Sequence, residues 1–304
     1  MKLIFLLSLI PACAQTRSVA ITIDDLPVAH SGPAACEYER LKAHTEVLLA
    51  PLIKEKAPVT AFFIGGNCPE LTAAQRKSVV GQWLAAAAEM GNHTYSHRGL
   101  NTAPIAEYEA DILKAEPVIK AATGGRTLRY FRSPMLQTGM DIETKRRLET
   151  FLNEHGYQQS PVTFDNSDWM FSYVYADALD RGDAALAKRV GDAYVPYMES
   201  VIAFFETRSV EVVGRDFPQV LLIHSNRLNA AKLPDLLAML KRRGYRFISL
   251  ETALRDPAYS LPNEYAGKGG FSWIHRWSKT KGMPGKGEPD EPAWLTEAYN
   301  HLRK

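Results

Sequence analysis

The sequence predicts an α/β fold in which helices cover a mostly parallel β-sheet. Short apolar runs alternate along the chain with longer amphipathic stretches, as in repeated strand–helix units. The 304 residues, of which 46% are hydrophobic and 23% charged, are enough for a large core in one barrel-sized domain or two medium domains. Several polar residues also fall where expected strands end, which is where parallel α/β barrels place their active sites.

The expected strands are short and rich in branched and aromatic residues. They are Ser18–Ile23, Pro58–Ile64, Leu128–Phe131, Gln158–Phe164, Gln219–Ile223 and Tyr245–Leu250. The expected helices lie between them and have apolar residues at helical spacing. They are Tyr38–Lys56, Thr72–Met90, Ile105–Ala122, Asp141–Glu154, Ala178–Phe205 and Leu233–Arg243. Residues 257–304 are rich in proline and glycine and are expected to form a tail, fixed to the rest by the aromatic residues Trp273 and Trp277.

The first 14 residues predict a targeting segment, because Lys2 precedes the apolar run Leu3–Ile10 and the small residues Ala12-Cys13-Ala14. The run is too short to span a bilayer, which takes about 20 apolar residues. Cleavage after Ala14 would release a periplasmic or secreted protein. Lipidation of Cys13 would instead leave a membrane-anchored lipoprotein, and a short apolar strand is the structural alternative.

Charge and cysteine content narrow the function classes further. A net charge of +2 without a dense run of Lys or Arg predicts no nucleic-acid partner. Cys36 and Cys68 remain after the targeting segment. In an oxidising compartment they could form a disulfide, but the sequence leaves two buried free thiols as an alternative.

The segment His93-Thr94-Tyr95-Ser96-His97 is a candidate metal site. Two histidines four residues apart lie on one face of a helical turn, so both rings can reach one ion, although such a pair is also common on helix surfaces. A carboxylate from Asp24-Asp25 would complete three ligands and leave a position open for water, as in catalytic zinc sites. Two other histidines, His44 and His155, fall in helical stretches and are expected at the surface.

Five separate polar clusters stand at or just beyond the ends of predicted strands. They are Asp24-Asp25, His93, Arg132, Asp165 with Asp168, and His224. With these residues the chain resembles the polysaccharide deacetylases with the NodB-homology domain, carbohydrate esterase family 4. The five ordered motifs of that family have counterparts in Thr22-Ile23-Asp24-Asp25, His93-Thr94-Tyr95-Ser96-His97, Arg132-Ser133-Pro134, Asp165-Asn166-Ser167-Asp168-Trp169 and Leu222-Ile223-His224.

The resemblance implies a distorted (β/α)7 barrel, residues 15–256, that removes acetyl groups from N-acetylated sugars with the help of a metal. Asp25, His93 and His97 would bind one divalent ion, with zinc preferred, which activates water and polarises the amide carbonyl. Asp24 would act as the general base. His224, at another strand end, would act as the general acid.

Supporting residues follow from the same motifs. Arg132 would hold Asp24 by a charge-assisted hydrogen bond, and Asp168 would orient His224. Trp169 and Leu222 would form a slot for the acetyl methyl group, or else belong to the core.

The third motif departs from the family pattern. Met135-Leu136 replaces an aromatic residue and a glycine, although the backbone N–H of Met135 could still donate to an oxyanion.

Three kinds of function remain open. The first is an N-deacetylase acting on a glycan. The second is a hydrolase of acetyl esters or small cyclic amides, because activated water attacks any polarised carbonyl. The third is a glycan-binding protein without catalysis, which is disfavoured because every proposed catalytic position holds a competent residue type.

Overall fold

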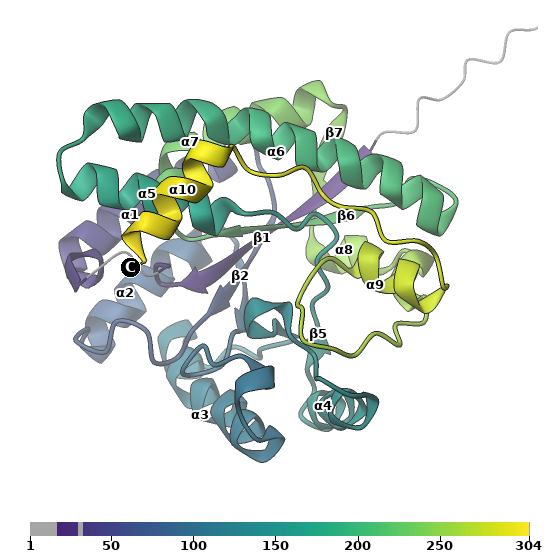
Figure 1. Ribbon diagram of the computed structural model, residues 1–304. Coiled ribbons are helices and arrows are strands. Elements are labelled where there is room, and N and C mark those ends of the chain that lie inside the picture. The colour runs from purple at the N-terminus through teal and green to yellow at the C-terminus, as the bar shows by residue number, and fades with distance from the viewer. Residues whose placement is uncertain (1–16, 30–32, 304) are drawn as a thin grey trace, which may run out of the picture.

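The computed structural model describes residues 17–29 and 33–303, and its core is a parallel seven-stranded sheet. The sheet curls into a distorted (β/α)7 barrel with helices around it, as the sequence predicts (Figure 1). The proposed targeting segment and Cys13 lie outside the described residues. Among the helices of the described part, none is both long and apolar enough to cross a bilayer.

The strands are β1 Arg17–Leu26, β2 Val59–Phe63, β3 Glu89–Asn92, β4 Tyr130–Phe131, β5 Gln158–Gln159, β6 Gln219–His224 and β7 Tyr245–Ile248. The α-helices are α1 Tyr38–Lys54, α2 Ala73–Ala85, α3 Ile105–Thr123, α4 Ile142–Glu154, α5 Asp168–Asp180, α6 Ala184–Val213, α7 Arg227–Arg242, α8 Leu250–Leu254, α9 Trp273–Thr280 and α10 Ala293–Leu302. Short 3-10 turns are η1 Pro33–Cys36, η2 Leu100–Thr102, η3 Pro134–Leu136 and η4 Pro257–Ser260.

The strand order β5-β4-β3-β2-β1-β6 is parallel throughout, and β7 pairs with the first half of β1. An isolated bridge between Phe164 and Leu221 brings the chain after β5 back to β6. The sheet is therefore curled almost into a ring, and the carboxyl ends of its strands meet at one end of it.

The alternation of side chains along β1 separates the helix-covered face from the barrel interior. Val19, Ile21 and Ile23 are buried in the main core with residues of the surrounding helices. Ala20 packs with Phe62 and other residues of a second, smaller cluster. Because alternate residues of a strand share a face, Thr22 and Asp24 lie on the same side as Ala20.

Several expected elements have different boundaries in the structure. The helix expected over Thr72–Met90 ends at Ala85, and β3 begins at Glu89. The strand expected over Gln158–Phe164 is reduced to two residues and the bridge at Phe164. The helix expected over Ala178–Phe205 is two helices, because α5 already begins at Asp168 and α6 runs to Val213.

Cys36 and Cys68 form a disulfide, with their Cα atoms 5.3 Å apart. Of the two alternatives that the sequence leaves open, pairing is thus the one found. The bond links η1, before α1, to the loop that follows β2.

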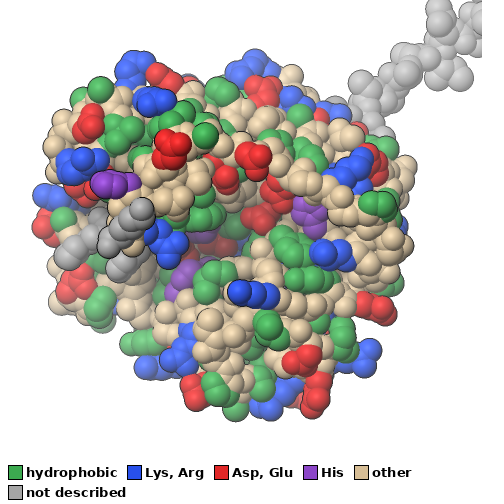
Figure 2. Space-filling model, in the orientation of Figure 1, with side chains coloured by type: hydrophobic (Ala, Val, Ile, Leu, Met, Phe, Trp, Pro, Cys, Tyr) green, Lys and Arg blue, Asp and Glu red, His purple; other side chains and the backbone are tan. Residues whose placement is uncertain are grey.

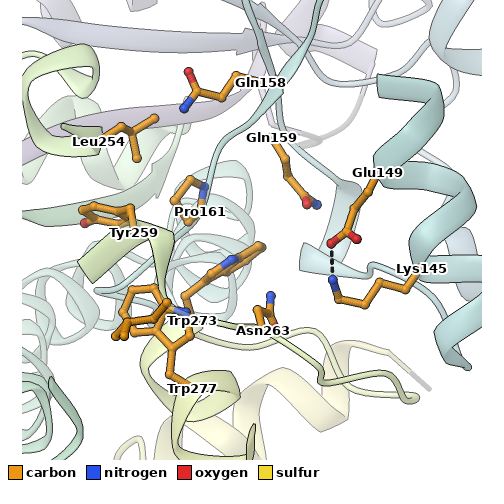
Figure 3. Close-up of a pocket in the computed structure, with 11 residues that line it drawn as sticks. Lys145, Glu149, Gln158, Gln159, Pro161, Leu254, Tyr259, Asn263, Trp273 and Trp277 are labelled. Carbon is orange, nitrogen blue, oxygen red and sulfur yellow. Dashed lines mark hydrogen bonds and ion pairs between the residues drawn. The ribbon is translucent and has the colours of Figure 1, made fainter. Parts of the chain in front are cut away.

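The tail packs along the barrel and contains helices α9 and α10. Trp273 and Trp277 of α9 are buried in the main core. Figure 3 shows them across a cavity of about 360 Å³ from β5 and from the ion pair between Lys145 and Glu149 of α4. In Figure 1, α10 lies over the end of the barrel near α5.

Candidate active site

A cleft of about 540 Å³ opens at the carboxyl ends of the strands. Histidine and acidic side chains gather in a hollow on the face seen in Figure 2. The predicted site residues that line this cleft are Asp24, Asp25, His93, His97, Met135, Trp169, Leu222 and His224. The two remaining ones, Arg132 and Asp168, are fully buried and bonded to cleft residues.

A bulge in β1 turns both adjacent aspartates toward the cleft. Successive residues of a regular strand point to opposite faces, so Asp24 and Asp25 would normally diverge. Asp25 instead has a φ of 65°, and the pairing of β1 with β2 shifts register between Ile23 and Leu26. This local break in the pleat lets Asp25 face the cleft beside Asp24.

Asp25, His93 and His97 converge, but not on a helix as the sequence predicts. His93 follows β3 directly, and the segment to His97 is a loop in which Thr94 and His97 have φ values of 63° and 56°. The prediction of a helical turn is therefore wrong. The left-handed residues fold the loop back so that the His93 and His97 rings lie 4.9 Å apart.

The donor atoms of this trio fit a metal ion. Asp25 Oδ1 lies 3.3 Å from His93 Nε2 and 3.1 Å from His97 Nε2. It is buried, and among the described residues it makes no hydrogen bond of good geometry. His93 Nδ1 lies 2.7 Å from the carbonyl oxygen of Arg132, so Nδ1–H donates there and Nε2 keeps a lone pair. Three converging donors of this kind are typical of a zinc site.

Arg132 fixes Asp24 from behind the cleft. Its Nη1 lies 3.2 and 3.1 Å from the two carboxylate oxygens of Asp24. The other guanidinium nitrogens donate to Thr22 and Ser160. A fully buried guanidinium with its donors used in this way holds the carboxylate in one orientation.

His224 is held on the other side of the cleft by Asp168. His224 Nδ1 donates to Asp168 Oδ1 at 2.6 Å, which leaves Nε2 available to the cleft. Asp168 Oδ2 accepts from the backbone N–H of His224 at 2.9 Å and from the amides of Asn229 and Asn226 at 2.6 and 3.3 Å. The carboxylate is therefore fixed as firmly as the imidazole that it orients.

Burial and neighbouring charges shift the pKa values of several cleft residues. Burial alone would lower the pKa of His224, but Asp168, with help from Asp25 and Asp24, raises it to about 10. Burial alone would raise the pKa of Asp25, but the imidazoles of His97 and His93 hold it well below its usual value. Burial and the nearby Glu288 raise the pKa of Asp165 to about 7. The cleft thus shifts the pKa values of two of its carboxyl groups in opposite directions.

The outer walls come from both the barrel and the tail. Trp169 is 45% exposed and Met135 48%, whereas Leu222 is buried. The tail contributes residues that the sequence did not identify. They are Gly270, Glu288, Tyr299 and Arg303.

The sequence analysis also missed two residues that support the site, Asn226 and Asn229. Asn226 caps α7 through the backbone N–H of Asn229, a cap that the sequence Ser225-Asn226 before an apolar stretch would suggest. The contact of both amides with Asp168 depends on tertiary structure. His44, expected at the surface, is instead bonded to Ser225 with its Nε2 3.2 Å from the hydroxyl.

The chain is similar to known proteins in sequence and in fold. Residues 12–160 match the family model described as polysaccharide deacetylase. The chain resembles a carbohydrate esterase family 4 pseudoenzyme of Bacillus anthracis, with a TM-score of 0.53 and 19% identity over 79% of this chain and 66% of that one. A mutant of that pseudoenzyme with restored activity gives the same TM-score and identity, over 79% and 68%.

A family 4 carbohydrate esterase of Streptomyces lividans, solved in complex with acetate, has a TM-score of 0.50 and 22% identity, over 78% of this chain and 95% of that one. At such identities these structures show a shared fold. The sequence match over residues 12–160, which contain strands β1 to β5 of the barrel, assigns that part of the chain to the polysaccharide deacetylase family.

Proposed function

We propose that this protein is a metal-dependent hydrolase that removes N-acetyl groups from an amino-sugar polymer or oligosaccharide. One observation carries the proposal. A three-donor metal set, a carboxylate held by arginine and an imidazole held by aspartate all face one cleft. A fold that had kept only glycan binding would not need all three.

The metal would be held by Asp25, His93 and His97, and zinc suits their oxygen and nitrogen donors. When bound, it would supply an activated water and polarise the acetyl carbonyl. Among the described residues this is the one cluster with ligating atoms close enough together.

Asp24 is the proposed general base. Its carboxylate lies beside the metal set, with Oδ2 3.8 Å from His93 Nε2, and is oriented by Arg132. A carboxylate in that position can accept the proton of the attacking water without leaving the guanidinium.

His224 is the proposed general acid. Its raised pKa keeps the ring protonated at neutral pH, and Nε2–H is the proton that the departing amine needs. The base and the acid come from neighbouring strands, since Asp24 of β1 pairs with His224 of β6. Their partners differ, since Arg132 holds Asp24 and Asp168 holds His224.

The acetyl group would lie between Trp169 and Leu222, with the backbone N–H of Met135 as an oxyanion donor. The barrel would comprise residues 15–256 and the tail 257–304. We further propose a location outside the cytoplasm, periplasmic or secreted, with Cys13 either removed or lipidated. The disulfide supports this location, because such bonds persist in oxidising compartments.

Acetate release tests the function. The zinc-loaded, full-length mature protein is incubated with the tetramer of N-acetylglucosamine, an aryl acetate ester and a small cyclic amide, and acetate or ring opening is measured. Acetate from the tetramer, lost on chelation and restored by zinc, is the expected result. Faster turnover of the ester or cyclic amide would favour the second class, and binding without turnover would mean a glycan-binding protein.

A further inference from the structure

The turn η3, which borders the cleft, has an unusual backbone. Met135 and Leu136 have φ values of 51° and 53°, in the left-handed region that residues with a side chain rarely adopt. Two such residues in succession cost of order a few kcal/mol and persist only when the surroundings hold them. The question is therefore what holds this turn.

The tail residue Arg276 contacts the turn directly. Its Nη2 donates to the carbonyl oxygen of Leu136, and its Nη1 donates to Thr138 Oγ1 at 2.7 Å. Its Nε donates to the carbonyl oxygen of Phe271 at 2.9 Å, which joins the turn to the tail's own backbone. The guanidinium carbon lies 4.1 Å from the centre of the Trp273 ring.

Burying the Arg276 guanidinium costs free energy of desolvation, which its contacts must offset. The side chain of Arg276 is fully buried, and among the described residues no carboxylate lies within ion-pair distance of it, although the nearby Asp165 favours its charge. Burying a cation without a carboxylate in direct contact is unfavourable, so its hydrogen bonds must compensate. A planar fork that reaches both Leu136 and Thr138 is a property of arginine that lysine lacks.

The tail backbone also makes close contacts with the turn and the residues after it. A Cβ added at Gly270 would lie 1.7 Å from the carbonyl oxygen of Met135, so glycine is required for this contact. The N–H of Gly267 donates to the carbonyl oxygen of Gly139 at 2.9 Å. On the other side, Asn101 donates to both segments. Its backbone N–H donates to Oε1 of Gln137, which follows the turn, and its side-chain amide donates to the carbonyl oxygen of Lys268 in the tail.

We propose that Arg276 is a positioning residue for the reaction. Together with Gly270, it holds the Met135–Leu136 turn so that the backbone N–H of Met135 stays in place at the cleft. The inference rests on the proposed function, because the oxyanion that the Met135 N–H would stabilise forms in the proposed acyl transfer. It assigns to the tail, which lies beyond the matched residues 12–160, a part of the active-site geometry.

The test compares two identical substitutions in the tail. Gly270→Ala forces the Met135 carbonyl to move, whereas Gly285→Ala meets nothing within 4 Å. For the zinc-loaded enzyme and the N-acetylglucosamine tetramer, Gly270→Ala is expected to lower kcat roughly 10- to 100-fold with KM and zinc content unchanged. Gly285→Ala is expected to keep the kcat of the unchanged protein.

A second readout does not depend on activity. Amide hydrogen exchange of residues 133–139, followed by mass spectrometry, is expected to accelerate in Gly270→Ala and in Arg276→Lys but not in Gly285→Ala. Arg276→Lys keeps the positive charge but removes the planar guanidinium that donates to both Leu136 and Thr138, so it separates the effect of the hydrogen bonds from that of the charge. It also provides the test if Gly270→Ala folds poorly.

The outcomes separate the two proposals. Faster exchange with a lower kcat supports the positioning role. Faster exchange with an unchanged kcat, or unchanged exchange in both variants, overturns it while leaving the deacetylase proposal intact. If the unchanged protein releases no acetate from any substrate, the proposed function fails and the catalytic role of Arg276 fails with it, whatever the exchange shows about the tail.

Discussion

At the scale of single residues, backbone conformation and one buried charge give two adjacent aspartates different surroundings. Arg132 is bonded to both carboxylate oxygens of Asp24. Asp25 adopts the left-handed conformation and approaches the imidazoles of His93 and His97 instead. One carboxylate thus faces a permanent cation and the other faces two metal-type donors. Their proposed roles as base and ligand follow from this difference, although their side chains are chemically identical.

Replacing each aspartate separately tests this division. Asp24→Asn is expected to lower kcat by roughly 10²- to 10⁴-fold, because it removes the proton acceptor, while the zinc content stays near one per chain. Asp25→Asn is the matched control and is expected to lose zinc as well as activity. The measurements are acetate release and metal analysis of the same samples. Loss of zinc from Asp24→Asn, or full activity in it, would contradict the assignment.

The pairing of His224 with Asp168 predicts a change in pH dependence. His224 must be protonated to act as an acid, so activity falls as the pH rises through its pKa. Asp168 offsets the effect of burial and raises that pKa to about 10. Asp168→Asn removes the charge, so the high-pH limb of kcat/KM is expected to move to lower pH by at least about one unit. An unmoved limb in a folded, zinc-loaded variant would mean that another group controls it.

At the scale of elements, the sequence predicts the strand–helix order well but fails where residues other than glycine are left-handed. The expected helix Thr72–Met90 ends early because Ala87 has a φ of 57°, a conformation that usually signals itself by glycine. The histidine loop turns at Thr94 and His97 for the same reason. The proposed ligands nevertheless come together as expected, since their residue types and positions at strand ends do not depend on the shape of the loop.

Helix α1 carries a partly buried histidine that affects stability at low pH. Burial, and then the charge of Arg227, lowers the pKa of His44 from 6.5 to about 4. Below pH 6.5, His44 is therefore protonated in the unfolded chain but stays neutral in the folded protein until the pH approaches 4. The contribution of this group is complete above pH 6.5 and is lost as the pH falls to about 4, by up to about 3 kcal/mol of the free energy of unfolding.

His44→Gln keeps an amide that can reach Ser225 but does not titrate. Compared with the unchanged protein, it is expected to lose less stability between pH 7.5 and pH 4.5, as measured by urea unfolding at each pH in the same metal buffer. The exposed His155 offers the control, because His155→Gln is expected to leave the pH dependence as it was. Parallel curves for all three proteins would show that His44 is not kept neutral by the fold.

At the scale of the whole molecule, the site depends on segments that are distant in sequence. The barrel brings together the ends of β1, β3 and β6. The alternation of strands and helices predicts β1 and β6, whereas β3 begins inside the expected helix Thr72–Met90 and was not predicted. The contribution of the tail could not be predicted, because Gly270, Glu288 and Tyr299 follow no periodic pattern that relates them to the cleft. Their placement depends on how Trp273 and Trp277 pack into the core, which is a property of the folded chain.

The disulfide is a second long-range link, and its removal should affect stability more than chemistry. Cys36 and Cys68 are 32 residues apart and do not line the cleft. Closing a loop of that length restricts the unfolded chain by about 3–4 kcal/mol. The double variant Cys36→Ser, Cys68→Ser is therefore expected to unfold at lower urea concentration, with zinc content and kcat unchanged at 25 °C. With enough reductant to open the disulfide, the free energy of unfolding of the unchanged protein should fall to that of the variant. A variant as stable as the oxidised protein would show that the link adds nothing to the fold.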